Sequence, residues 1–142
     1  MEKKLPIFVY GTLLGGWGNY AQYVQPYKHE VVPAEISGVV YHLPMGYPGL
    51  LPGSGQVRGN LLFFAPDDYD RALSGLDELE TYYGPKDRRN EYERVAATAR
   101  TASGEEVEAY VYVYVDEHYV KAEGTLVADG DWQRFMRERQ PE

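Results

Sequence analysis

Runs of β-branched and aromatic residues recur along this chain between turn residues, a pattern that predicts several strands. The first run, Ile7–Tyr10, stops at Gly11. A second strand is expected over Ala34–Leu43, with Gly38 at a bulge, and it leads into the Pro- and Gly-rich segment Pro44–Gly55. We interpret that segment as a long ordered loop, and loops of this length in small domains often serve function.

The second half of the chain continues the strand pattern. Strands are predicted over Arg58–Ala65, Arg94–Thr101 and Val107–Val115, with a hairpin turn at Ser103-Gly104 between the last two. Valines alternate with tyrosines in the last strand. The period of two therefore places on one face Tyr110, Tyr112 and Tyr114.

Helical spacing is present in three places. Asn19–Val24 is expected to form a short helix, and a stronger pattern follows Pro66, which suits a first-turn position. Near the C-terminus, Asp129-Gly130-Asp131 is interpreted as a helix start. The apolar residues after it have helical spacing and predict a helix packed on the body of the protein: Trp132, Phe135 and Met136.

The helix after Pro66 turns one carboxylate inward. At about 100° per residue, Leu76 lies within about 20° of Tyr69, and Glu80 lies about 20° to the other side. Glu78 falls on the opposite face, towards water. Burial and the negative end of the helix dipole both raise a carboxyl pKa, and a general base works best when its pKa is near the working pH. Glu80 is therefore the candidate base.

The turn at Gly11 is the second candidate feature. A strand that ends in a glycine-bearing turn leaves backbone N–H groups without ladder partners, and converging N–H groups can hold a small anion such as a carboxylate. Gly11 has no Cβ, so a ligand can approach its backbone closely. The alternative is an ordinary turn that binds only water. A P-loop is excluded because Trp17 and Gly18, not Lys and Ser or Thr, follow Gly16.

Length and composition favour one small globular domain over residues 1–142. The chain has 142 residues, no cysteine and a net charge of −8. The lack of cysteine excludes thiolate nucleophiles and cysteine metal sites. The negative charge makes nucleic acid and anionic membranes poor partners.

We expect a cytoplasmic protein without membrane partners. The longest uncharged run, residues 36–57, contains three prolines and five glycines and cannot form a membrane helix. The apolar run before Gly11 is too short for the hydrophobic part of a signal peptide.

Other chemistries have weaker support. Asp77 and Glu80, three positions apart, could act as a paired acid and base, or Glu80 could form a structural ion pair with Arg94. The three histidines, His29, His42 and His118, lack metal-ligand spacing, so no metal site is predicted.

A set of short motifs, in this order and over nearly the whole chain, resembles the γ-glutamylcyclotransferase-like family, which includes the γ-glutamylamine cyclotransferases. They are Phe8-Val9-Tyr10-Gly11-Thr12-Leu13, Tyr47-Pro48-Gly49, Pro52-Gly53-Ser54-Gly55, Val57-Arg58-Gly59, Leu76-Asp77-Glu78-Leu79-Glu80, Tyr92-Glu93-Arg94, Val113-Tyr114 and Gly130-Asp131-Trp132.

The resemblance implies an α+β fold, a small mixed β-barrel with a few peripheral helices and one cavity. It also implies that a loop holds the glutamyl end of the substrate through backbone amides, and this loop maps onto Tyr10, Gly11, Thr12 and Leu13. The catalytic glutamate of the family falls on Glu80.

Two positions depart from the family pattern. Thr81 stands where the family often has a glycine after the catalytic glutamate, and Asn60 stands where a glutamate often follows the glycine at Gly59. Neither residue is the proposed base, and both bear on substrate choice.

Our first hypothesis is an enzyme that cyclises a γ-glutamyl compound to 5-oxoproline and a free amine, with Glu80 as acid and base and without a metal or other cofactor. Tyr114 is expected to point into the pocket and to hydrogen-bond the substrate. The second hypothesis is a binding module that captures a small carboxylate in the same pocket without turnover. A scaffold protein that uses its tyrosine face would have no pocket.

Overall fold

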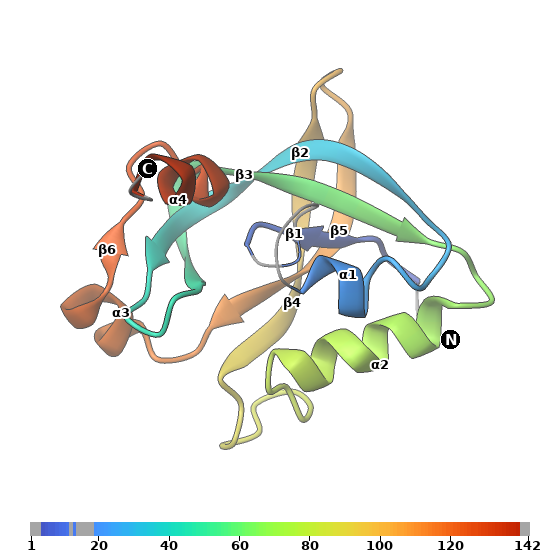
Figure 1. Cartoon of the computed structure of the whole chain (residues 1–142), viewed down its shortest axis with the longest axis horizontal. Coiled ribbons are helices and arrows are strands. Elements are labelled where there is room, and N and C mark those ends of the chain that lie inside the picture. The colour runs from blue at the N-terminus through green and yellow to red at the C-terminus, as the bar shows by residue number, and fades with distance from the viewer. Residues whose placement is uncertain (1–3, 12, 14–18, 140–142) are drawn as a thin grey trace.

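A computed structural model describes residues 4–11, 13 and 19–139 (Figure 1). Within these ranges, six strands form one sheet, and four helices lie around it. The strands are β1 (Ile7–Val9), β2 (His29–His42), β3 (Pro48–Phe64), β4 (Tyr92–Thr101), β5 (Glu106–Tyr114) and β6 (Thr125–Leu126). The helices are α1 (Tyr20–Tyr23), α2 (Tyr69–Leu79), α3 (Glu117–Glu123) and α4 (Trp132–Arg139).

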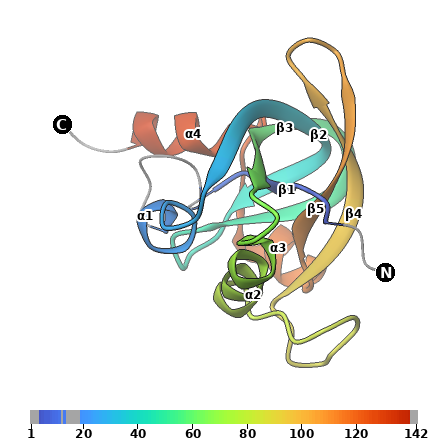
Figure 2. The ribbon, with the colours of Figure 1, turned by 90° about the vertical axis from the view of Figure 1, so that its right-hand side faces the viewer.

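Five of the strands close into a mixed barrel, which confirms the expected fold. β1 lies between β3, to which it is antiparallel, and β5, to which it is parallel. β5 then pairs with β4, β4 with β2, and β2 with β3, so the sheet returns to its start. The short strand β6 adds to the edge of β2. The tip of the β4–β5 hairpin extends beyond the barrel (Figure 2).

The alternation of side chains along each strand separates two apolar cores. One core takes residues from all five barrel strands, among them Phe8, Leu61 and Val111. The other core lies on the opposite face of the strands and includes Tyr112, Tyr114 and the buried side of α2. The tyrosines of β5 therefore share one face, as predicted from their period of two.

The buried stripe of α2 agrees with the helical wheel. Tyr69, Ala72 and Leu76 are buried, while Glu78 is exposed. α2 begins later than expected, because Pro66 lies in a turn in which the Asp68 N–H donates to the Ala65 carbonyl (2.9 Å).

The expected loop over residues 44–55 is wrong from Pro48 onwards. Residues 48–51 pair with residues 39–42, so only residues 43–47 connect β2 to β3. The register shifts between Ser37 and Val39, where the four residues 52–55 stand opposite the single residue Gly38. The predicted bulge at Gly38 is therefore correct, and the glycines and prolines bend a strand where we expected a loop.

Strand β2 also starts five residues earlier than expected, and two short elements, α3 and β6, were not predicted. Val120 is the one buried residue of α3, and the sequence of α3 has no apolar stripe from which a helix could be predicted. It is started by Asp116, whose side chain accepts a hydrogen bond from the Tyr119 N–H (3.0 Å). α4 begins as predicted after Asp131, whose side chain accepts from the Arg134 N–H (3.0 Å).

Within the described ranges, no helix has the length and apolar character needed to cross a membrane.

Candidate active site

The end of α2 fixes the position of Glu80. Glu80 is the residue directly after the last helical residue, and its N–H donates to the Leu76 carbonyl (2.9 Å). Beyond it, the Thr81 N–H donates to the Glu78 carbonyl (3.2 Å) and the Tyr82 N–H to the Asp77 carbonyl (2.9 Å). This pair of bonds is the Schellman motif, which satisfies the last carbonyl groups of a helix.

The motif requires a left-handed residue, and Thr81 occupies that position with a φ of +56°. Glycine is favoured here because any Cβ is crowded in the left-handed region, and a β-branched side chain more so. The departure from the family's glycine thus falls on a strained backbone position next to the candidate base. The fold accommodates the strain because the Thr81 carbonyl also accepts a hydrogen bond from the Glu91 N–H (3.0 Å).

The Glu80 carboxyl lies half-buried in the wall of a cavity, and its surroundings raise its pKa to about 8. The larger cause is burial, which disfavours the charged form, and the second is the negative charge of Glu91. Within the described part of the chain, neither Glu80 carboxylate oxygen has a hydrogen-bond or ion-pair partner. The carboxyl is therefore available to a ligand.

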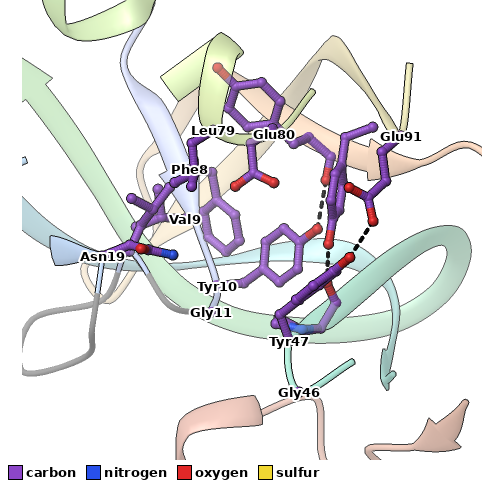
Figure 3. Close-up of a pocket in the computed structure, with 14 residues that line it drawn as sticks. Phe8, Val9, Tyr10, Gly11, Asn19, Gly46, Tyr47, Leu79, Glu80 and Glu91 are labelled. Carbon is purple, nitrogen blue, oxygen red and sulfur yellow. Dashed lines mark hydrogen bonds between the residues drawn. The ribbon is translucent and has the colours of Figure 1, made fainter. Parts of the chain in front are cut away.

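The cavity has a volume of about 200 Å³ and brings together residues that are far apart in the sequence (Figure 3). It is lined by Phe8, Val9, Tyr10, Gly11, Leu13, Asn19, Gly46, Tyr47, Pro48, Leu79, Glu80, Glu91, Tyr92 and Tyr112. Tyr10, Gly11 and Leu13 at the Gly11 turn thus line the same cavity as Glu80. Thr12 lies outside the described residues.

The ring of Pro48 excludes a side chain at Gly11. β1 ends at Val9, so the amide groups of Tyr10 and Gly11 lie beyond the strand ladder. A Cβ on Gly11 would stand 2.4 Å from Cγ of Pro48, an unacceptably close contact with a rigid ring. The glycine is thus required by the packing against Pro48 of β3.

Tyrosines form much of the cavity wall. The Tyr10 hydroxyl donates to the Tyr112 carbonyl (2.7 Å), and the Tyr92 hydroxyl donates to the Pro48 carbonyl (2.5 Å). Both rings are buried, and burial is the main reason why the pKa of each hydroxyl is raised. Tyr114 is not among the lining residues. Tyr112, two positions earlier on β5, lines the cavity instead.

The sequence analysis missed Glu91, the second carboxylate of the cavity. Its Oε2 accepts hydrogen bonds from the Tyr47 hydroxyl and from the Tyr114 hydroxyl (3.2 Å). Glu91 directly precedes β4 and ends a charged stretch, residues 86–91, which in the sequence is typical of an exposed loop. The preceding residue, Asn90, is buried and fixes that loop through the Tyr83 N–H (2.7 Å) and the Gly84 carbonyl (2.8 Å).

The other carboxylate of α2 has a structural role. Asp77 accepts hydrogen bonds from Arg94 (2.5 Å) and from the Tyr112 hydroxyl (2.6 Å), and Arg94 also lies over the rings of Tyr82 and Tyr110. The alternative in which Arg94 pairs with Glu80 is therefore wrong. Asp77 forms an ion pair with Arg94. The structure therefore gives no support to Asp77 and Glu80 acting together as acid and base.

Two of the histidines are held by aromatic neighbours. His29 bonds to the Tyr20 hydroxyl (2.8 Å), and His42 accepts from the indole N–H of Trp132 (3.1 Å). Within the described residues, no group of three His, Cys, Asp or Glu side chains could hold a metal ion.

Comparison with known proteins identifies the family of this chain. The family described as "Gamma-glutamyl cyclotransferase, AIG2-like" matches residues 7–134. Among curated proteins, the chain is 30% identical over 129 residues to gamma-L-glutamyl-butirosin B gamma-glutamyl cyclotransferase from Niallia circulans. The match covers 91% of this chain and 76% of that protein.

Solved structures share the fold. The protein ytfP from Escherichia coli is 28% identical, with a TM-score of 0.61, and the match covers 90% of this chain and 96% of that one. An AIG2-like protein from Mus musculus is 23% identical, with a TM-score of 0.59 over 80% of each chain. With a family match over most of its length, this chain is an enzyme that belongs to the AIG2-like family of γ-glutamyl cyclotransferases.

Proposed function

We propose that this enzyme cyclises a γ-glutamyl amide to 5-oxoproline and releases a free amine, with Glu80 as general base and general acid. The observation that carries the proposal is a half-buried carboxyl without a partner among the described residues, facing a cavity that also contains the Gly11 turn. The family and the γ-glutamyl substrate named for the Niallia circulans relative support a γ-glutamyl compound as the ligand.

The glutamyl end of the substrate would bind at the Gly11 turn. Backbone N–H groups beyond the end of β1 suit an α-carboxylate, and they can be approached closely because Gly11 has no side chain. A cavity of about 200 Å³ is smaller than the ~300–1,000 Å³ of pockets that enclose drug-sized ligands, so it suits the glutamyl group better than a whole large substrate.

Glu80 would first accept a proton from the substrate. The α-amine of the substrate arrives as an ammonium ion and must lose a proton before its nitrogen can attack the γ-carbonyl carbon. A carboxyl with a pKa of about 8 is a much stronger base than an ordinary glutamate. Transfer of a proton from the α-ammonium group therefore costs less free energy than transfer to an unperturbed carboxylate, which favours general base catalysis.

Ring closure needs no second reactant. The amine attacks the γ-carbonyl carbon of its own molecule and forms the ring C–N bond, the C–N bond to the leaving amine breaks, and protonated Glu80 returns its proton to the departing nitrogen. The ring nitrogen then loses its second proton to Glu80, which passes it to the amine, so that the products are 5-oxoproline, with a neutral amide nitrogen, and an ammonium ion. Holding the folded-back conformer in the tyrosine-walled cavity supplies rate, because the reacting atoms are already in contact. Proton and bond changes balance, and no metal or covalent intermediate takes part in this scheme.

The test is 5-oxoproline release from a panel of γ-glutamyl amides by the parent enzyme and by Glu80→Gln, which keeps the size of the side chain. We expect turnover by the parent and a loss of ~10²-fold or more in the variant, the usual effect of removing a positioned base. A protein that binds the amides but releases no 5-oxoproline would instead be a carboxylate-binding module.

A further inference from the structure

Asp77 holds the turn that carries Glu80 through both its backbone and its side chain. Its carbonyl accepts from the Tyr82 N–H (2.9 Å), a bond of the Schellman motif around Glu80. Its carboxylate accepts from Arg94 (2.5 Å) on β4 and from the Tyr112 hydroxyl (2.6 Å) on β5. The end of α2 is therefore tied to two strands of the barrel, three residues before the proposed base.

Arg94 clamps the same turn from its other side. Its guanidinium lies 5.1 Å from the centre of the Tyr82 ring and 4.8 Å from that of the Tyr110 ring. Arg94 thus contacts the chain both before and after Glu80. A guanidinium attracted to two aromatic faces stays in place, and so it fixes Asp77 relative to Tyr82.

Tyr112 extends the link to the other half of the site. It lines the cavity, and its carbonyl accepts from the Tyr10 hydroxyl (2.7 Å). Tyr10 directly precedes Gly11 in the turn that would hold the α-carboxylate of the substrate. Tyr10 and Tyr112 are both buried, so water competes little for their hydroxyls. Two hydrogen bonds, which meet at Tyr112, thus connect the helix of the proposed base with the turn proposed to bind the substrate.

The ion pair of Asp77 with Arg94 provides direction more than stability. The two side chains are only 22% and 17% exposed, and at such sites the cost of desolvation offsets much of the attraction between the charges. Ala72 and Leu76 bury α2 through apolar contacts, which are non-directional. Charge-assisted hydrogen bonds have a defined length and angle, so they can fix the rotation of the helix end and its position along the helix axis.

We propose that Asp77 is a positioning residue, which acts through Tyr112 and sets the place of the Glu80 carboxyl. Arg94 holds Asp77 in this role, and the position that matters is the one relative to a substrate bound at the Gly11 turn. The inference rests on the proposed function, because it names what aligns the base in the same cavity. A misplacement of about 1 Å can slow a reaction by about 10²-fold, so release of this network should lower kcat and leave substrate affinity nearly unchanged.

Tyr112→Phe and Tyr69→Phe form a matched pair of variants. Each removes one hydroxyl that anchors an end of α2, since the Tyr69 hydroxyl donates to the Leu5 carbonyl (2.6 Å) at the start of the helix. Tyr112→Phe should lower kcat for 5-oxoproline release by about tenfold or more and keep KM within about twofold of the parent. Tyr69→Phe should lower the melting temperature and keep the parent kcat.

Both variants are assayed well below their melting temperatures, and Tyr112→Phe leaves the ion pair of Asp77 in place, so the fold is kept. The parent kcat in Tyr112→Phe overturns the proposal. An equal loss of kcat in the two variants overturns it too, because a merely structural role would affect both.

Variants of Asp77 show whether the two residues act together. Asp77→Asn keeps an acceptor oxygen for Tyr112 and should retain more of the parent kcat than Asp77→Ala. Glu78→Ala, a change at the exposed neighbour on the same helix, should keep the parent rate. The double variant Asp77→Ala/Tyr112→Phe should be no slower than Asp77→Ala alone. Losses that multiply mean that the Tyr112 hydroxyl acts on the substrate by itself, which overturns the proposal.

The pH dependence separates position from charge. The pKa of Glu80 is raised by burial and by the charge of Glu91, and Tyr112→Phe removes no charge. The acid limb of kcat/KM should therefore stay at about pH 8 in Tyr112→Phe while the plateau falls. A limb that moves while the plateau stays unchanged overturns the proposal.

Failure of the positioning role and failure of the function are distinguishable. If the parent releases no 5-oxoproline from any γ-glutamyl amide, the function fails, and hydrogen exchange at the N–H groups of Glu80 and Tyr82 then decides on the positioning role. Exchange that is about tenfold or more faster in Tyr112→Phe, but not in Tyr69→Phe, supports it. Equal protection in the two variants overturns it.

Discussion

Replacing Glu80 with Gln tests both the chemistry and the electrostatics of the cavity. Gln has nearly the same shape as Glu but cannot take up or release a proton at neutral pH. Loss of the base should lower turnover by ~10²-fold or more. Substrate affinity should change much less, because the backbone amides at the Gly11 turn are untouched.

The same substitution should make the fold more stable at high pH. The pKa of Glu80 is raised from its ordinary 4.5 to about 8, so the folded protein retains a proton that the unfolded chain releases. Between pH 4.5 and pH 8 the unfolded state binds fewer protons than the folded state, and stability therefore falls as pH rises. At 1.36 kcal/mol per pH unit, the shift corresponds to about 5 kcal/mol above pH 8, an upper limit because the carboxyl is partly exposed to the cavity.

Urea unfolding between pH 5 and pH 9 measures this difference. The free energy of unfolding of Glu80→Gln should diverge upwards from that of the parent as pH rises, and the gap should close towards pH 5. Glu78→Gln, on the exposed face of the same helix, should follow the parent throughout.

Two results would refute the reasoning. A Glu80→Gln enzyme that cyclises at the parent rate ends the role of Glu80 as base. A Glu80→Gln protein that is less stable than the parent at pH 8 means that the carboxylate forms a stabilising contact that the described residues do not reveal.

Three further predictions concern neighbouring residues. kcat/KM should fall about tenfold per pH unit below about pH 8, and Glu91→Gln should move this limb to lower pH because it removes a negative neighbour of Glu80. Thr81→Gly should raise stability by up to about 1 kcal/mol in thermal melts, since it relieves the left-handed backbone, whereas Thr81→Ala should not. Arg94→Met should lower the free energy of unfolding in urea, by less than the roughly 3–5 kcal/mol of a fully buried pair, because the partly buried Asp77 loses its cation, and Asp77→Leu combined with it should recover most of the loss.

Features that depend on local pattern were predictable from the sequence. The tyrosine face of β5 follows from a period of two, and the buried stripe of α2 follows from a period of 3.6. Glu80 was found for the same reason: it continues that stripe by one residue beyond Leu79. Glu80 lies at the cavity because the helix ends where the apolar pattern ends.

Features that depend on long-range pairing were not predictable. Pro48 to Leu51 looked like a loop because prolines and glycines are turn residues, and only their partners on β2 make them a strand. Glu91 looked like part of a charged loop. Its backbone N–H donates to the Thr81 carbonyl, and its side chain accepts from the hydroxyl of Tyr47, which lies in the connection between β2 and β3. These two contacts hold Glu91 at the cavity. No spacing in the sequence encodes these contacts.

The two kinds of feature meet at the end of α2. The Schellman motif that stops the helix leaves Glu80 as its first non-helical residue and turns the chain back at Thr81. The carbonyl of Thr81 then binds the amide of Glu91 and brings the second carboxylate to the first. One turn of backbone thus sets the position of the proposed base and the distance to the charge that tunes it. A left-handed threonine at this turn costs stability. Replacing Thr81 with Gly should therefore raise the melting temperature and leave the turnover rate nearly unchanged, as long as the two hydrogen bonds of the motif remain.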